Sequence, residues 1–139
     1  MLGRIIAGQE FDASLVVRFF NAHTENDTII LDNGHRLPML RQQSDSPVCL
    51  CLSDFISPQA DQPSTIGVFC LKVSDRHNCP DCRDFEHLLR ESLCARLTEA
   101  LAVWMQEQVN DGLQMIRPAF GYPACPDHSL KKEVFELLD

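Results

Sequence analysis

Residues 116–128 read Ile116-Arg117-Pro118-Ala119-Phe120-Gly121-Tyr122-Pro123-Ala124-Cys125-Pro126-Asp127-His128. We call this stretch the proline ribbon, and the rest of the chain is arranged around it. Its prolines fix φ near about −65° and push the residues before them towards extended backbone. Gly121 supplies one point at which φ can be positive. The sequence therefore predicts a stiff, non-helical segment that carries a guanidinium, a phenol, a thiol, a carboxylate and an imidazole.

A long helix is predicted before the ribbon and a short one after it. Apolar residues recur at helical spacing from about residue 83 to about residue 108, and we expect this helix to be the spine of the core. Arg90 is among the charged residues of its opposite, solvated face. The short helix is expected over residues 129–138, with Asp127 or Ser129 as its N-cap. Its apolar set is Leu130, Val134, Leu137 and Leu138.

The first part of the chain is rich in β-branched and aromatic residues. Strands are predicted at residues 15–20 and 28–31, with residues 21–27 as a loose polar loop between them. Asn33-Gly34 is a strong hairpin signal, because both residues tolerate positive φ. Pro38 is expected to keep the strand after this turn short.

Two further strands are predicted before the long helix. Residues 48–52 read as a buried strand, or as a strand-like entry to the next segment, and residues 65–73 read as the central strand of the sheet. Asp54 lies between apolar neighbours, where an unpaired charge would be costly. From the residues alone, the simplest interpretation is that Asp54 caps a turn or short helix.

Length and composition limit the classes of protein. A chain of 139 residues with 45% hydrophobic content predicts a single domain spanning residues 1–139. The net charge of −8 argues against a nucleic-acid surface. No run approaches the roughly 20 apolar residues of a membrane span. We therefore expect a cytoplasmic protein with no membrane or nucleic-acid partner, whose seven cysteines are reduced thiols.

Cysteine and histidine spacing gives one metal hypothesis. Cys79 and Cys82 have the two-residue gap of a zinc knuckle, and Cys125 and His128 have the same gap. Together these four side chains form a Cys3His set that suits tetrahedral zinc. The competing interpretation is that Cys79 and Cys82 lie in a loop at the start of the helix. No catalytic residue is predicted, because nearness in sequence does not place His128 to activate Cys125.

The ribbon resembles the signature of the S-adenosylmethionine-binding activation domain of cobalamin-dependent methionine synthase. Residues 40–43, 51–58 and 95–102 also resemble segments of that family, in the same order. The resemblance spans roughly residue 35 to the C-terminus. It implies an α+β fold, with a twisted antiparallel sheet, one long helix and shorter flanking helices.

The resemblance also implies a function. In that family, the domain binds S-adenosylmethionine and presents its methyl group for reductive methylation, and so reactivation, of cob(II)alamin. The cobalamin sits on a partner, the cobalamin-binding methionine synthase module, and flavodoxin or another reductase supplies the electron. The chain would then be part of a methyltransferase system and not active alone.

Six residues match positions of the family's binding site. Arg117 matches the arginine that pairs with the methionyl carboxylate, and Asp54 matches the acid at the amino end. Glu99 matches a second acid of the same cleft, and Ala119, Gly121 and Tyr122 match the part of the motif that lies against the nucleoside. The chemistry is consistent, since a ligand with a carboxylate, an ammonium and a sulfonium needs a fork-shaped cation and at least one acid.

The chain also departs from the family pattern. Residues 110–115 form a short link where the family has a long helical insertion, and a tyrosine-containing segment that closes over the ligand would lie beyond Asp139. We therefore expect a shortened, stand-alone relative that acts in trans on a separate cobalamin protein or forms a homodimer. The alternative is a non-catalytic interaction module that keeps the fold but has lost the ligand, with the zinc site as a structural element.

Overall fold

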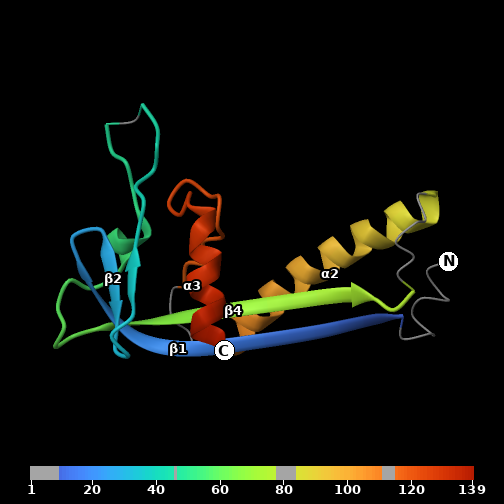
Figure 1. Ribbon diagram of the computed structural model, residues 1–139, viewed down its shortest axis with the longest axis horizontal. Coiled ribbons are helices and arrows are strands. Elements are labelled where there is room, and N and C mark those ends of the chain that lie inside the picture. The colour runs from blue at the N-terminus through green and yellow to red at the C-terminus, as the bar shows by residue number, and fades with distance from the viewer. Residues whose placement is uncertain (1–9, 46, 78–83, 111–114) are drawn as a thin grey trace. The chain divides into compact units, whose positions relative to one another are not determined.

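The computed structural model describes residues 10–45, 47–77, 84–110 and 115–139. Over these residues it has an α+β fold, with a curled antiparallel sheet of four strands, one long helix and one short helix (Figure 1). The order of strands in the sheet is β3-β2-β1-β4. The predicted fold class is confirmed. The elements are β1 (Phe11–Glu25), β2 (Thr28–Leu31), β3 (Arg36–Pro38), the 3-10 helix η1 (Leu52–Phe55), β4 (Ser64–Asp75), α2 (Phe85–Val109), the 3-10 helix η2 (His128–Leu130) and α3 (Lys131–Leu138).

Contacts divide the chain into two compact units. The helix unit comprises Met1–Val16 and Leu71–Met115, and the ribbon unit comprises Val17–Cys70 and Ile116–Asp139. The ribbon unit therefore contains the hairpins, η1, the proline ribbon and α3, whereas the helix unit contains α2. The assignment of residues 1–139 to one domain stays a prediction.

The first hairpin is tighter than predicted. Residues 21–25 belong to β1 and pair with β2, with Ala22 opposite Leu31 and Glu25 opposite Thr28. The chain reverses at Asn26, which has a φ of 53°. The predicted loop at residues 21–27 is thus wrong. Polar residues remain in the strand because only one of its faces is covered, and Ala22 is the residue that this face buries.

The second hairpin is confirmed, although Gly34 has the positive φ that was expected of both turn residues and Asn33 does not. Gly34 has a φ of +84°, and its N–H donates to the Leu31 carbonyl at 2.9 Å. The Leu31 N–H donates to the His35 carbonyl at 3.0 Å, which closes the turn from the other side. Pro38 is the last residue of β3, as predicted from its missing N–H. Ile29 lies opposite Leu37, and both are buried, so this face of the hairpin carries core residues.

Of two further strand predictions, one is wrong, and the other is confirmed except for the position of the strand in the sheet. Residues 48–51 are irregular, and Val48 and Leu50 are exposed, so the predicted buried strand at residues 48–52 is not formed. One backbone hydrogen bond is formed there, in which the Gln42 N–H donates to the Leu50 carbonyl at 2.8 Å. The strand predicted at residues 65–73 exists as β4, but β4 stands last in the order of strands. Its apolar run had suggested a central position.

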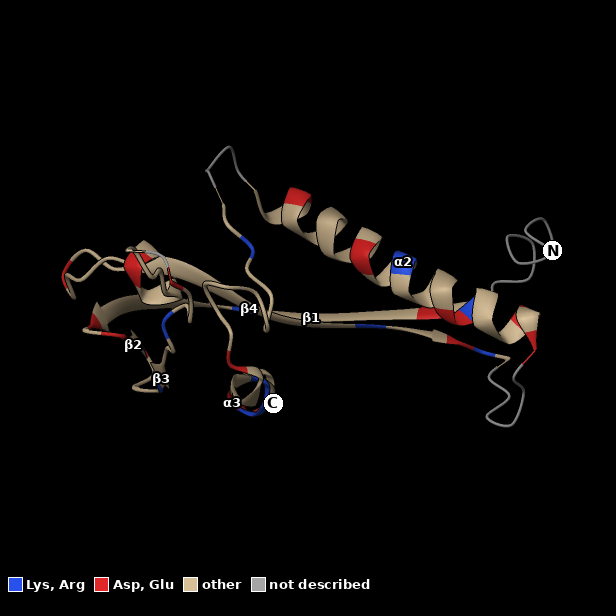
Figure 2. Cartoon of the chain, turned by 90° about the horizontal axis from the view of Figure 1, so that it is seen from above, with Lys and Arg blue, Asp and Glu red and all other residues tan. Residues whose placement is uncertain are grey.

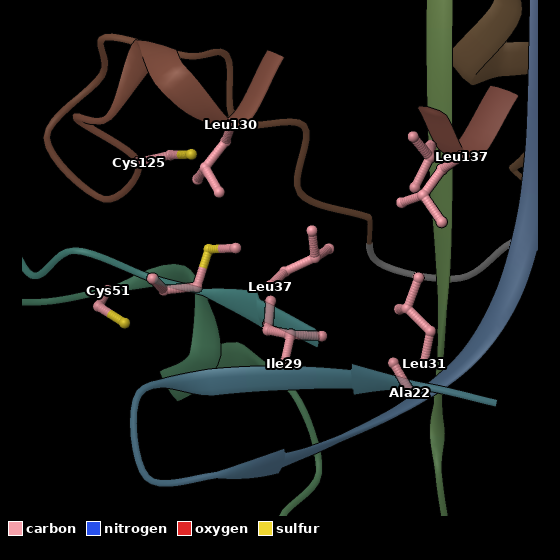
Figure 3. Close-up of a cluster of buried hydrophobic side chains, with 10 residues drawn as sticks. Ala22, Ile29, Leu31, Leu37, Cys51, Cys125, Leu130 and Leu137 are labelled. Carbon is pink, nitrogen blue, oxygen red and sulfur yellow. The ribbon is translucent and has the colours of Figure 1, made fainter. Parts of the chain in front are cut away.

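The core of the ribbon unit lies between the hairpins and the C-terminal segment. Ile29 and Leu37 contribute from β2 and β3, and Cys125 and Leu130 contribute from the segment above them (Figure 3). Leu137 brings α3 onto the same core, which confirms the predicted apolar face of the last helix. The buried cluster consists of Ala22, Ile29, Leu31, Leu37, Met39, Cys51, Val68, Cys125, Leu130 and Leu137.

The long helix has the predicted length. α2 ends at Val109, with Asn110 as its C-cap, but none of its residues belongs to the buried cluster. Leu88 and Trp104, from the expected core face, are exposed, whereas Ala102 and Met105 are buried. The expectation that this helix is the spine of the core stays a prediction, because α2 and the buried cluster belong to different units. Helical spacing identifies an apolar face but not what covers it.

Arg90 of α2 is buried in the helix unit, contrary to the expected solvated face. Its guanidinium contacts the Glu10 carboxylate, donates to Asp75 at 3.0 Å and lies 5.9 Å from the centre of the Phe11 ring. A buried guanidinium needs such partners because its charge has left water. This ion network joins α2 to the outer ends of β1 and β4 within the helix unit.

Charged side chains are distributed along the described elements. Figure 2 shows Lys and Arg scattered over the described elements and acidic residues spaced along α2. Lys131 and Lys132 are adjacent in α3. Among the described residues, no helix has both the length and the hydropathy to cross a bilayer.

Asp84 caps the N-terminus of α2 and gives a first prediction. Its carboxylate accepts from the His87 N–H at 2.9 Å. Asp84→Ala should lower stability by about 1 kcal/mol and shorten the helix, because it leaves an N–H of the first turn without its acceptor. Circular dichroism at increasing urea concentrations measures both effects. Asp84→Asn is the matched control, since asparagine caps equally well, and equal losses in the two variants would contradict the capping role.

Candidate functional site

The proline ribbon forms a compact turn, as its composition predicts. It contains no strand, and helix begins only at its last residue. The Gly121 N–H donates to the Cys125 carbonyl at 2.9 Å, and the Cys125 N–H donates to the Tyr122 carbonyl at 2.8 Å. The Tyr122 N–H donates to the Ala119 carbonyl at 3.2 Å. These bonds hold Ala119, Gly121 and Tyr122, three of the predicted binding residues, in one turn.

Gly121 is required by the shape of this turn. Its φ is +94°, in the region that L-residues with side chains rarely adopt. A Cβ built at this position would lie 2.6 Å from the His128 Nε2 atom. The imidazole therefore packs directly against the glycine. The next side chain, Tyr122, is 64% exposed, so the turn presents an aromatic ring at the surface.

The ribbon is anchored at its C-terminal end. Cys125 is buried in the core, and Asp127 caps η2 by accepting from the Ser129 N–H at 2.8 Å. Hydrogen bonds from the Ser129 side chain and backbone lower the pKa of Asp127. Glu133 of α3 lies 2.9 Å from the His35 Nε2 atom in the second hairpin. The segment that follows the ribbon is thus fixed to the hairpins by packing and by polar contacts.

Asp54 lies in η1, in the same unit as the ribbon. Its Oδ2 accepts from the Cys51 N–H at 2.9 Å, so the predicted capping role is confirmed. Arg41 donates to both carboxylate oxygens, with both distances at 2.8 Å. The hydrogen bonds from Arg41, and next the one from Cys51, lower the pKa of Asp54. Asp54 is therefore held ionised beside a positive charge.

η1 and the ribbon rest on one core. Cys51, the N-cap of η1, and Cys125 of the ribbon belong to the same buried cluster. Leu52 and Phe120 pack against this cluster from the two segments. Asp54 and Gly121 are far apart in sequence, but the segments that contain them pack on the same buried cluster.

The remaining predicted site residues are Arg117 and Glu99. Arg117 is half-buried near the start of the ribbon. Glu99 is exposed on α2, in the helix unit. The described structure thus gathers Arg117, Ala119, Gly121, Tyr122 and Asp54 in the ribbon unit, and Glu99 belongs to the other unit.

The zinc hypothesis rests partly on residues outside the described ranges, since Cys79 and Cys82 lie there. Cys125 is buried, and burial, with the negative charge of Asp127, raises the pKa of its thiol. A raised pKa disfavours the thiolate that zinc binds. Within the described ranges, no three His, Cys, Asp or Glu side chains are grouped as metal ligands. The zinc site stays a prediction.

Sequence reasoning missed Arg41 as a functional candidate. Its segment, residues 40–43, was noted only for its family resemblance. The contact with Asp54 spans 13 positions between two irregular segments, so neither helical nor strand periodicity could predict it. The only signal for this contact in the sequence is that a basic residue, Arg41, follows a predicted hairpin that contains an acid, Asp27.

A family model for the activation domain of vitamin B12-dependent methionine synthase matches this chain at residues 1–113 and 110–139. The two matched segments meet at the short link after α2. A solved structure, described as the crystal structure of the MetH reactivation domain bound to AdoHcy, is 27% identical and superposes with a TM-score of 0.83. The match covers 99% of this chain and 53% of that chain, so this chain spans about half its length. The chain belongs to the family of activation domains of vitamin B12-dependent methionine synthase.

Proposed function

We propose that this chain binds S-adenosylmethionine and presents its methyl group for the reactivation of cob(II)alamin. The observation that carries the proposal is the match of nearly the whole chain to a reactivation domain whose structure holds AdoHcy, the demethylated form of this donor. The cobalamin would be held by a separate methionine synthase module, on which the chain acts in trans. A flavodoxin-like reductase would supply the electron.

The residues of the ribbon unit supply the chemical groups that such a ligand requires. The Arg117 guanidinium can pair with the methionyl carboxylate through two parallel hydrogen bonds. The ionised Asp54 carboxylate suits the ammonium group. Three N–H groups of the ribbon turn already donate to carbonyls within the turn, so they are not available to an adenosine. The adenosine would instead pack against the exposed Tyr122 ring.

Methyl transfer breaks the bond between the donor's sulfur and its methyl carbon and releases S-adenosylhomocysteine. The electron from the reductase lets cob(II)alamin accept the methyl group. The chain's own contribution is to bind and orient the donor, which lowers the entropic cost of bringing the reactants together. None of its side chains is proposed to form a covalent intermediate.

Titration calorimetry with S-adenosylmethionine tests the binding step. The wild-type chain should bind, and Arg117→Ala should weaken binding by about 10- to 100-fold, because it removes charge-assisted hydrogen bonds to the carboxylate. Arg36→Ala is the matched control, since Arg36 is an exposed arginine of the same unit that pairs with Glu25 at 3.1 Å. Absence of binding by the folded wild-type chain would contradict the proposal.

One observation favours the second candidate, a non-catalytic interaction module without the ligand. Both oxygens of Asp54 already accept hydrogen bonds from Arg41. A carboxylate whose acceptor positions were all taken up within the protein could not recognise an ammonium group. A folded wild-type chain that gives no heat with S-adenosylmethionine would support this module, and metal analysis of the same sample would decide its zinc content.

A further inference from the structure

Arg41 uses all its hydrogen-bond donors within the ribbon unit. A guanidinium has five N–H groups, and the structure gives Arg41 five bonds. Nε and Nη2 donate to the two oxygens of Asp27, at 3.1 and 2.6 Å. Nη1 and Nη2 donate to the two oxygens of Asp54, and Nη1 also donates to the Cys49 carbonyl at 3.0 Å. We call Arg41, Asp27 and Asp54 the Arg41 cluster.

The cluster fixes the plane of the Asp54 carboxylate. Two parallel bonds from one guanidinium orient a carboxylate in a way that a single bond cannot. Asp27 holds the guanidinium from the other side, and its own carbonyl accepts from the Met39 N–H at 2.7 Å. Arg41 is therefore held between the turn of the first hairpin and η1, and it cannot leave Asp54 without breaking bonds to both segments.

Asp54 nevertheless keeps an acceptor position. A carboxylate offers about four lone-pair positions. Among the described residues, Oδ2 accepts from Arg41 and from Cys51, whereas Oδ1 accepts from Arg41 only. The side chain of Asp54 is 31% exposed, so this remaining position on Oδ1 can be reached from solvent.

The charge of the cluster favours a cation at that position. One guanidinium faces two carboxylates, Asp27 and Asp54, so a negative charge remains when both acids are ionised. Arg41 thus does not neutralise the pair. A ligand ammonium that donates to Oδ1 would meet an oriented acceptor in a negative field, which adds electrostatic attraction to the hydrogen bond.

We propose that Arg41 is a positioning residue that holds Asp54 ionised and directs its one free acceptor position, on Oδ1, at the ammonium group of the bound donor. This inference rests on the proposed function, and it accounts for the occupied Asp54 without loss of the ligand. Arg41 acts through Asp54 and does not contact the ligand.

The test measures the affinity for S-adenosylmethionine as a function of pH in the wild-type chain, Arg41→Gln, Asp27→Asn and Arg36→Gln. The groups that face Asp54 are the Arg41 guanidinium and the Cys51 N–H, with Asp27 on the far side of Arg41. Because the pKa of Asp54 is lowered, wild-type affinity should hold as the pH falls from about 7 to about 4 and be lost only below that range. In Arg41→Gln the pKa rises, and the loss should move to higher pH by about one unit or more.

Two controls separate this effect from a loss of structure. Arg36→Gln, at an exposed arginine of the same unit outside the Arg41 cluster, should keep the acid loss of the wild-type chain. Asp27→Asn removes one acid of the cluster and part of the hold on Arg41, so it should weaken the affinity. Methylthioadenosine lacks the amino-acid part of the donor, so at each pH its affinity should be the same for the wild-type chain and for Arg41→Gln, including the acid range in which its adenine becomes protonated. Circular dichroism at each pH shows whether the variants remain folded.

The outcomes are distinct. A wild-type chain that binds neither ligand overturns the proposed function, and with it this inference. If the wild-type chain binds and Arg41→Gln keeps the same pH profile, or if Arg41→Gln loses affinity for methylthioadenosine in parallel, the positioning role of Arg41 is overturned and the proposed function stands.

Discussion

Gly121→Val is expected to destabilise the ribbon unit and to remove binding at the ribbon. A β-branched residue at a φ of +94° costs up to about 3 kcal/mol in backbone strain. The new Cβ would also lie 2.6 Å from the His128 Nε2 atom, so the imidazole must turn away. The turn that carries Ala119 and Tyr122 would open. Urea unfolding monitored by circular dichroism measures the stability, and calorimetry measures the binding.

Gly34→Val is the matched control for this variant. Gly34 has a similar φ of +84°, but a Cβ there would meet no heavy atom within 4 Å. Both variants should therefore lose stability through strain, and only Gly121→Val should lose ligand affinity. Adding His128→Ala to Gly121→Val removes the imidazole that the new Cβ would meet. The double variant should therefore recover part of the lost ligand affinity. Equal affinities in the two single variants would contradict the role of the ribbon turn.

Leu31→Ala is expected to lower the stability of the ribbon unit by about 2–5 kcal/mol, because it leaves a cavity in the buried cluster. Leu31 is 2% exposed, and its backbone bonds to Gly34 and His35 are kept in the variant. The loss would thus report packing and not the hairpin. Urea unfolding measures it.

Two leucines serve as controls for this variant. Leu40, in the ribbon unit, is 49% exposed, and Leu88, on α2, is 60% exposed. Their alanine variants should each lose less than about 1 kcal/mol, since little apolar surface leaves the protein interior. A loss in Leu88→Ala as large as that in Leu31→Ala would support the sequence-based view of α2 as the spine of the core.

The elements that could be predicted from sequence are those set by local chemistry. Gly34 sets the turn of the second hairpin through its backbone conformation, Pro38 ends the strand after it, and Asp127 caps η2, which leads into the last helix. The ribbon was recognisable because prolines and Gly121 limit its backbone to few conformations. Each of these signals lies within a few residues of the structure that it determines.

The features that could not be predicted depend on distant partners. Arg90 is buried against Glu10 and Asp75, which lie in other parts of the chain. The sequence of α2 alone therefore does not predict the burial of Arg90. β4 has an apolar run but stands at one end of the strand order, which depends on the pairing of the whole sheet. Arg41 reaches Asp54 and Asp27 through irregular backbone. For the candidate site, the resemblance to the family pointed to Asp54 but not to Arg41, the residue that orients the Asp54 carboxylate.

The division of the ribbon unit into two stretches of sequence constrains the order of folding during synthesis. Its first stretch ends at Cys70 and its second begins at Ile116, so the helix unit's second segment is made between them. Leu130 and Leu137 complete the core over Ile29 and Leu31, which leave the ribosome roughly 100 residues earlier. The hairpins must therefore wait with an open apolar face until the C-terminal segment emerges. Such a long closing loop favours slow completion of this unit.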